Sequence, residues 1–308
     1  MGQTSLSYGY ENRRTQINTL SLFIGSTVIW GTTWLALKAQ AGVVDPSVSI
    51  AYRFLIGSCL FFILHYIRTQ KFLPKLPKRM HLMVFFQGIF MFGLAYEPFF
   101  PASKYMASGL LAVIFSAIAL PNIFLGALFF KTPIRPQVIL GSLLGIAGVV
   151  ATFWKDVETL DIADNAVYGI LLGLTGTLLA SFGQIIAAKV SRSGVRVTDS
   201  APYAMLYGAL FMLIYCIAKG ETITIDWSIS YVAPTLYLGV MGSFIAFWAY
   251  LTLIGRIGPG RAAYVLVATP IIALCISSIY EGYTWTIATF IGMSLVVAGN
   301  VLVLRGKT

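Results

Sequence analysis

Long runs of hydrophobic residues, separated by short polar segments, dominate this chain. One run continues without a charged residue from Leu110 to Phe130. A helix needs roughly 20 apolar residues to cross the hydrocarbon core of a bilayer. A transmembrane barrel would instead alternate polar and apolar residues along strands of about ten residues. The unbroken runs therefore predict transmembrane helices rather than strands.

Ten such runs can be placed along the chain. Polar residues or the helix breakers Pro and Gly separate them, for example Pro74, Pro77 and Pro133. The expected spans are residues 18–37, 48–67, 81–96, 106–130, 137–154, 167–189, 201–218, 232–254, 262–280 and 285–304. The third span is the shortest, so a merged or divided helix is most easily missed there.

The composition excludes a soluble protein. Hydrophobic residues make up 58% of the 308 residues and charged residues 10%, whereas soluble domains carry about 25% charged residues. So few charges cannot cover the surface of a globule of this size. The high hydrophobicity also excludes a disordered chain, and ten spans leave no room for a large soluble catalytic domain.

The positive charge of the chain, +10 at pH 7, has a distribution that predicts orientation. With the N-terminus inside, 16 basic residues fall on the cytoplasmic side and 4 on the outer side, while Arg53 lies within a span. Lys and Arg are enriched in cytoplasmic loops of membrane proteins. We therefore expect a multi-pass protein of the inner (plasma) membrane with both termini in the cytoplasm, and no nucleic-acid partner.

The two halves of the chain resemble each other. A shift of 151 residues places Gly141 on Gly292 and Gly148 on Gly299. Because five spans is an odd number, the second half must cross the membrane with opposite polarity. We expect an all-α integral membrane fold in which ten transmembrane helices form two inverted five-helix repeats. The expected segments are a cytoplasmic tail (1–17), a first repeat (18–154), a periplasmic linker (155–166), a second repeat (167–304) and a cytoplasmic tail (305–308).

Several loose motifs follow one another in order. They are IWGTTWLALK (29–38), YRFLIG (52–57), SGLLAVIFSAIALPNIFLGALFF (108–130), GSLLGIAGVV (141–150), GPGRAAYVLVATPIIALCISSIYEG (258–282) and GMSLVVAGNVLV (292–303). This ordered set resembles the EamA-type branch of the drug/metabolite transporter (DMT) superfamily over about residues 18–304. The resemblance implies a central cavity lined by helices 1, 3, 4, 6, 8 and 9, and transport of small metabolites, often export. Family members often close the fourth helix of a repeat with an acidic turn, which the second repeat keeps as Glu281-Gly282 and the first replaces by Lys131-Thr132.

Aromatic residues with polar tips and neutral polar residues mark the candidate binding site. Trp30, Thr33 and Trp34 share one helical face through their i, i+3, i+4 spacing. Ring faces and a few hydrogen bonds hold small amphipathic solutes. The candidate substrate-binding residues are Trp30, Thr33, Trp34, Tyr96, Gln184, Trp248 and Tyr264. For each of them, packing or a place in an interfacial aromatic belt is the alternative.

Two charged residues are candidates for binding or coupling. Arg53 lies inside the second span, where a charge costs at least ~2–3 kcal/mol unless it is paired or near water. It either binds a substrate carboxylate or phosphate or has a structural role, such as pairing with Glu97. Glu97 is the candidate for proton coupling, but no carboxylate lies in the middle of an expected span, so uncoupled transport stays open.

Pro121 and Pro270 lie at matching places in the fourth and ninth expected spans. Proline frees a carbonyl group inside a helix, and membrane helices tolerate this where the carbonyl finds another partner. The two prolines are therefore candidates for bends that gate the cavity, with a fixed kink as the alternative.

The expected function is a secondary transporter, an exporter of small organic metabolites such as amino acids or related amphipathic compounds, that works by alternating access. The chain contains no Walker, HExxH or GxSxG motif, so we expect no enzyme, no cofactor and no metal. The alternative is an integral membrane enzyme acting on lipid or isoprenoid substrates, which would need clustered acids or histidines at one membrane depth. The expected partners are the lipid bilayer and a small-molecule substrate, and the oligomeric state is left open.

Overall fold

The computed structural model describes residues 4–42, 44–131, 133, 135–152, 165–262 and 264–305, and all regular elements within those ranges are helical. Inside a bilayer, backbone polar groups must be bonded within their own segment, so apolar runs become helices. In the described ranges, seven helical segments are long and apolar enough to cross a membrane, and three shorter apolar helices accompany them. These segments coincide with the ten expected spans and confirm the all-helical membrane fold.

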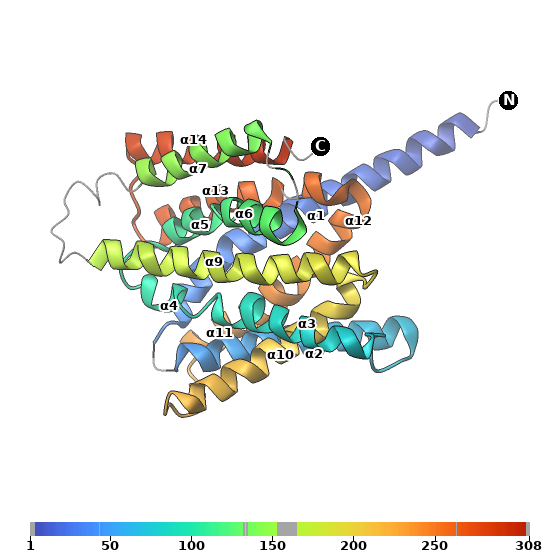
Figure 1. Cartoon of the computed structure of the whole chain (residues 1–308), viewed down its shortest axis with the longest axis horizontal. Coiled ribbons are helices and arrows are strands. Elements are labelled where there is room, and N and C mark those ends of the chain that lie inside the picture. The colour runs from blue at the N-terminus through green and yellow to red at the C-terminus, as the bar shows by residue number, and fades with distance from the viewer. Residues whose placement is uncertain are drawn as a thin grey trace.

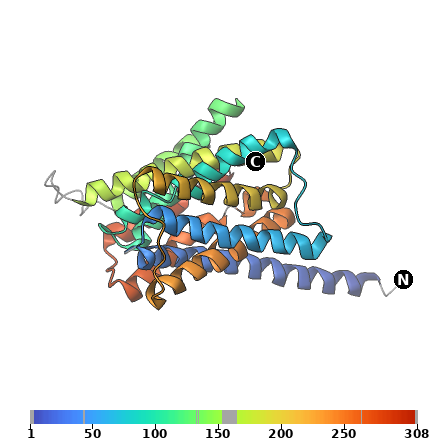
Figure 2. The same ribbon diagram turned by 90° about the horizontal axis from the view of Figure 1, so that it is seen from below.

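The helices follow one another in two similar series. The first series is α1 (Thr4–Gln40), α2 (Pro46–Thr69), α3 (Lys78–Ile89), the π-helix η1 (Phe90–Leu94), α4 (Phe99–Ala102), α5 (Ser108–Ser116), α6 (Ala119–Phe130) and α7 (Pro136–Thr152). The second series is α9 (Asn165–Arg192), α10 (Val197–Ala218), α11 (Ile229–Tyr237), the π-helix η2 (Leu238–Ile245), α12 (Ala246–Ala262), α13 (Tyr264–Tyr280) and α14 (Ile287–Arg305). The helices run along the longest axis of the molecule (Figure 1 and Figure 2).

Only some of the expected segments can be compared with the structure, because others lie outside the described residues. In the tail expected at 1–17, α1 begins at Thr4 and continues into the first span, which begins at Thr19. Most of the linker expected at 155–166 lies outside the described residues, as do residues 306–308 of the C-terminal tail. The short third span, expected at 81–96, belongs to a longer helical segment from Lys78 to Ala102.

Matched glycines bring the two halves together where α7 and α14 lie side by side (Figure 1). A Cβ atom added to Gly141 would lie 2.6 Å from the carbonyl oxygen of Gly299, and one added to Gly148 would lie 2.6 Å from that of Gly292. The 151-residue shift relates Gly141 to Gly292 and Gly148 to Gly299, so it turns each of these two contacts into the other. Such a reciprocal pair is what a pseudo-twofold axis between the helices produces, so the repeat seen in the sequence is also a repeat of contacts.

A second pair of contacts repeats in the same way around the two π-helices. Gly57 on α2 packs against Ser243 of η2, and Gly208 on α10 packs against the backbone of Phe92 in η1. The 151-residue shift places Gly57 on Gly208 and Phe92 on Ser243. Each repeat therefore has a π-helix at the same place, and π-helical turns occur often at functional sites.

The outer surface of the bundle is apolar. Along α7, the exposed side chains include Ile139, Leu140, Leu143, Ile146 and Val150. Soluble monomers rarely expose a continuous patch of this kind. Lipid tails are the natural neighbours of these side chains.

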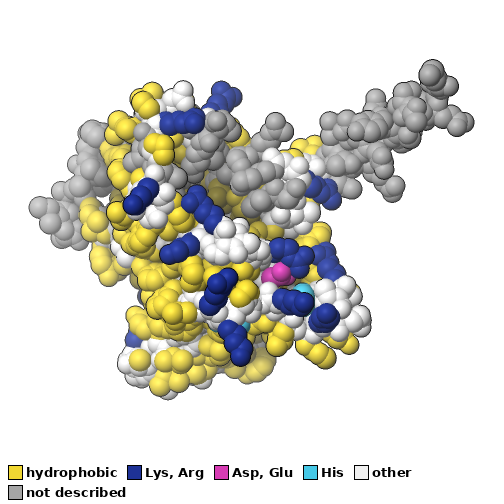
Figure 3. All heavy atoms as spheres, turned by 45° about the vertical axis from the view of Figure 1, so that its right-hand side comes forward, with side chains coloured by type: hydrophobic (Ala, Val, Ile, Leu, Met, Phe, Trp, Pro, Cys, Tyr) yellow, Lys and Arg dark blue, Asp and Glu magenta, His cyan; other side chains and the backbone are white. Residues whose placement is uncertain are grey.

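Basic residues gather at one end of the bundle (Figure 3). The helix ends there include the C-terminal ends of α6 and α9 and the N-terminal ends of α7 and α10, with Lys131, Arg135, Lys189, Arg192 and Arg196 on or between them. We call this the basic end. The other end, which contains the C-terminal ends of α1, α10 and α13, is called the opposite end.

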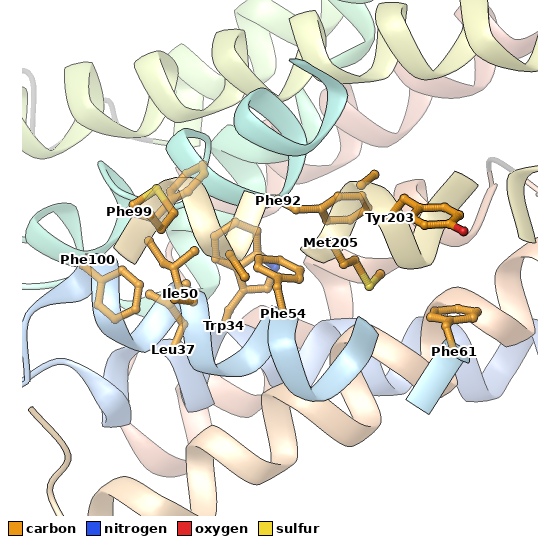
Figure 4. Packing of buried hydrophobic residues seen from close by; sticks show 14 of the residues in the cluster. Trp34, Leu37, Ile50, Phe54, Phe61, Phe92, Phe99, Phe100, Tyr203 and Met205 are labelled. Atoms are coloured by element: carbon orange, nitrogen blue, oxygen red, sulfur yellow. The ribbon is translucent and has the colours of Figure 1, made fainter. Parts of the chain in front are cut away.

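The largest buried cluster joins α2, the η1 region and α10. Figure 4 shows its labelled side chains in a continuous layer from Phe99 and Phe100 to Tyr203 and Phe61. Phe54 lies inside this layer, in ring contact with Phe92 at 5.1 Å. This layer fixes the stretch of α2 from which Arg53 projects.

Candidate functional site

A cavity of about 930 Å³ lies inside the bundle. Side chains from α1, the η1 region, α5, α6, α9, α12 and α13 line it, together with Arg53 of α2. Val138 of α7 and Val197 of α10 also line it. Apart from these two residues and Arg53, the lining helices are helices 1, 3, 4, 6, 8 and 9 of the sequence numbering, which are those the family resemblance implied. The cavity thus lies between the two repeats, where inverted-repeat transporters hold their substrates.

Five of the seven candidate binding residues line the cavity: Trp30, Thr33, Trp34, Tyr96 and Gln184. Trp248 and Tyr264 are not among its lining residues, for reasons of helical phase. On α12 the cavity face is Phe247, Tyr250 and Leu251, and Trp248 packs against the large buried cluster instead. On α13 the face is Leu266, Thr269 and Pro270, so Tyr264, two residues before Leu266, points away.

Tryptophans form one wall of the cavity. The indole Nε1 of Trp30 donates a hydrogen bond of 3.2 Å to the backbone carbonyl of Gly242, which lies in η2. The ring of Trp30 also packs on Phe247 and Tyr250, with centroid distances of 5.2 and 5.1 Å. These contacts pin the indole in place, because a hydrogen bond and two ring contacts fix both of its torsions. The wall is therefore rigid and offers flat apolar surface to a solute.

An amide network forms another part of the wall. Ser181 Oγ donates to Asn122 Oδ1 at 2.7 Å, and Asn122 Nδ2 donates to Gln184 Oε1 at 2.8 Å. Asn122 and Gln184 both line the cavity. A primary amide has two donor hydrogens and an oxygen with two acceptor sites, so the network has capacity left for a solute. Asn122 was not among the seven candidates, although a lone amide in an apolar span is a signal that the sequence contains.

Arg53 lies in the cavity wall with 3% of its surface exposed. Its Nε donates a long hydrogen bond of 3.5 Å to Ser243 Oγ. Its guanidinium carbon lies 4.7 Å from the ring centroid of Phe54 and 4.4 Å from that of Tyr96. Within the described ranges, no carboxylate lies within ion-pair distance of Arg53. The ion pair with Glu97, one of the alternatives for Arg53, is absent because Glu97 binds Lys219 instead.

The cavity opens at the basic end. The lining residues there are exposed, namely Pro133, Arg135, Ser191 and Arg192. The guanidinium of Arg192 lies 3.9 Å from the ring centroid of Phe130 at this mouth. A solute therefore has an entry path from the basic end.

An ion-pair cluster lies at the opposite end, between α1, α5 and α13. Lys38 Nζ lies 2.7 Å from Glu281 Oε1, and the carboxylate also accepts hydrogen bonds from the backbone N–H of Ser108 and from Ser277 Oγ, at 3.0 and 2.5 Å. Burial alone would raise the pKa of Glu281, but the hydrogen bonds from Lys38, Ser108 and Ser277 hold the pKa below its usual value. The cluster stays charged at neutral pH and ties the two repeats together. We call it the Glu281 cluster.

A second ion-pair cluster lies at the same end between α2, α4 and α10. Lys219 Nζ lies 3.2 Å from Asp45 and 3.0 Å from Glu97. Burial would lower the pKa of Lys219, but Glu97 and Asp45 raise it above its usual value. Burial would raise the pKa of Asp45, but hydrogen bonds from Ser47 and Lys219 lower it. Glu97 is thus part of this ion-pair cluster and not of the cavity wall.

The two candidate prolines differ in their surroundings. The fourth expected span is divided by a turn at Ala117 and Ile118, directly before Pro121, whereas α13 continues through Pro270. Proline at position 121 leaves the carbonyl of Ala117 without its helical donor, which fits the break. Pro270 lines the cavity, and Pro121 is not among the lining residues.

Comparison with known proteins shows which family this chain belongs to. A family model described as the EamA-like transporter family matches residues 18–154 and 167–305. An uncharacterized transporter of Archaeoglobus fulgidus is 22% identical over 92% of this chain and 97% of its own length. The uncharacterized inner membrane transporter YedA of Escherichia coli is 25% identical, covering 91% and 88%. A crystal structure of a protein with 19% identity has a TM-score of 0.66 and covers 93% of this chain and 96% of that one, which supports the fold. The chain is therefore a multi-pass membrane protein that belongs to the EamA-like transporter family.

Proposed function

We propose that the chain is a secondary transporter of small organic metabolites, such as amino acids or related amphipathic compounds, and that it works by alternating access. The observation that carries this is the position of the cavity between the two repeats, with aromatic rings and amides in its wall. Aromatic faces suit an apolar body, and amides suit a polar group on the same molecule. The open basic end and the ion-paired opposite end correspond to one state of an alternating cycle.

We further propose that the basic end faces the cytoplasm and that transport is export. The enrichment of Lys and Arg at this end supports that orientation, and a cavity open there would load substrate from inside the cell. Labelling single cysteines in the 155–166 segment from either side of the membrane tests it. Labelling of that segment from the cytoplasmic side alone would reverse the orientation.

Coupling to protons is not needed for this proposal. In the part of the chain that the structure describes, no Asp or Glu lines the cavity. Glu97, the candidate for coupling, is held by Lys219 at the opposite end and does not line the cavity. This supports transport driven by the gradient of the substrate itself.

The test is flux into sealed vesicles that contain the purified protein. Labelled amino acids are supplied outside, and accumulation is compared with that in empty vesicles and in vesicles treated with a proton ionophore. Saturable uptake that the ionophore does not abolish is the expected result. Chemical conversion of vesicle lipids without any solute flux would instead favour the membrane-enzyme alternative.

A further inference from the structure

A buried positive charge in the cavity wall meets only neutral groups among the described residues. Arg53 Nε donates to the hydroxyl group of Ser243, and no carboxylate of the described residues pairs with Arg53. A buried guanidinium without a counter-ion is unfavourable in a bilayer. We propose that Arg53 binds the carboxylate of the transported solute, an inference that rests on the transport function proposed above.

The geometry of the guanidinium favours a planar anion at its edge. The rings of Phe54 and Tyr96 both lie against the group, at 4.7 and 4.4 Å from its central carbon. Rings stacked on a guanidinium occupy its faces and leave the in-plane N–H donors free for ligands. A carboxylate meets two such donors side by side. Tyr96 also lines the cavity, so the bound carboxylate would lie beside aromatic surface.

The fold itself does not require an arginine at this place. The 151-residue shift places Arg53 on Ala204, and the two residues lie in corresponding helix contacts, α2 with η2 and α10 with η1. Ala204 is fully buried there, and its carbonyl oxygen packs against Gly88. The second repeat therefore has a methyl group at the position where the first repeat has a guanidinium. The charge is an asymmetric addition to a symmetric scaffold, as expected for a residue that binds a ligand.

Gly242 keeps room beside the guanidinium. A Cβ atom at this position would lie 2.9 Å from Thr33 and 3.9 Å from Nη2 of Arg53. Because Gly242 has no side chain, Thr33 and the indole of Trp30 lie close to the same stretch of η2. The ligand class that fits is a carboxylate with an aromatic or other apolar body.

The experiment compares an acid with its uncharged amide. The purified protein in lipid nanodiscs is titrated with benzoate and with benzamide at constant ionic strength, and binding is followed by the shift in melting temperature. Inorganic phosphate is titrated as a second anion. The variants are Arg53→Gln and Arg53→Ala, and the matched control is Arg68→Gln, which makes the same charge change on an exposed part of the same helix.

Wild type and Arg68→Gln are expected to bind benzoate at least about tenfold more tightly than benzamide, the ratio that one charge-assisted pair supplies. Both Arg53 variants should fold, melt no lower than wild type without ligand, and lose the preference for benzoate. Equal binding of acid and amide by wild type, a preference that survives in Arg53→Gln, or a response to phosphate alone would overturn the proposal. So would failure of both variants to fold, since Arg53 would then be structural. Solute flux that does not depend on Arg53 would overturn this inference and leave the transport function standing.

Discussion

At the scale of single residues, the candidate site depends on side chains whose pattern is visible in the sequence and whose direction is not. Asn122 and Gln184 come from different halves of the chain and meet at 2.8 Å in the cavity wall. Trp248 has the same chemistry as Trp30 and Trp34 but lies on another face of its helix. Residue type suggests a role, and helical phase decides whether the side chain reaches the cavity.

Replacement of the amide network by alanine should impair transport more than stability. Asn122→Ala and Gln184→Ala each remove a polar contact from the cavity wall, so we expect flux into vesicles to fall by roughly tenfold, the loss equivalent to about one hydrogen bond. Trp248→Phe is the control, because Trp248 does not line the cavity and this variant keeps an aromatic ring. Normal flux in both alanine variants at equal protein level would show that the network has no part in transport.

At the scale of helices, close backbone contact holds α7 against α14. Gly→Ala at position 148 would place a methyl group 2.6 Å from the carbonyl oxygen of Gly292. We expect Gly148→Ala to lower the free energy of unfolding by about 1–3 kcal/mol through overpacking, measured as a lower melting temperature in detergent. Gly145→Ala on the same helix is the control, because nothing lies within 4 Å of its added Cβ. It should be neutral or stabilising, since alanine is a better helix former than glycine. Equal effects of the two changes would argue against this packing.

At the scale of the whole molecule, the two ion-pair clusters lie at the opposite end while the cavity opens at the basic end. We infer that the clusters keep the opposite end closed. Glu281→Gln weakens the contact with Lys38 and should shift the population toward a form that opens at the opposite end. The measure is labelling of Ala112→Cys, a buried cavity residue on α5, in a chain without Cys59, Cys216 and Cys275. A membrane-impermeant maleimide is supplied only on the side of the opposite end, because the cavity is already open at the basic end. We expect labelling about tenfold faster than with the native carboxylate, which corresponds to about 1.4 kcal/mol.

The control for this change is Asp226→Asn, since Asp226 is exposed and bonds to its neighbour Ser228 rather than to either cluster. Faster labelling in Asp226→Asn as well, or an unchanged rate in Glu281→Gln, would contradict the role of the Glu281 cluster in closure.

The same closure should depend on pH in a defined direction. The pKa of Glu281 is held below its usual value of 4.5 by Lys38, Ser108 and Ser277, against the effect of burial. A carboxylate whose pKa is lowered in the folded protein stabilises it fully when the pH is above the usual pKa. This stabilisation is lost as the pH falls through the lowered pKa. Because maleimide reacts with the thiolate, the labelling rate of Ala112→Cys is divided by that of a small thiol at the same pH. This ratio should be constant at neutral pH and rise in acid below about pH 4.5. In Glu281→Gln this rise should be absent, and a rise of the same size there would assign it to other groups.

Features of the amino-acid sequence alone determine much of the fold. The lengths of the apolar runs set the number of spans, because the bilayer core has one thickness and each span must cover it. Gly141, Gly148, Gly292 and Gly299 reveal the repeat, since only residues without a side chain allow this backbone contact. The helices around the cavity follow from the family resemblance, and the EamA-like family model matches each half of the chain separately, which agrees with the internal repeat.

The partners of the charged and polar side chains depend on the packing of helices that are distant in the sequence. Lys38 meets Glu281, and Glu97 meets Lys219 rather than Arg53, because the inverted arrangement of the repeats decides which helix ends are neighbours. The spacing of these four residues along the sequence does not indicate which of them form ion pairs. The helix is broken before Pro121 and continues through Pro270, although both prolines lie in long apolar runs. Local hydrophobicity thus determines the spans, and the contacts between them determine the site.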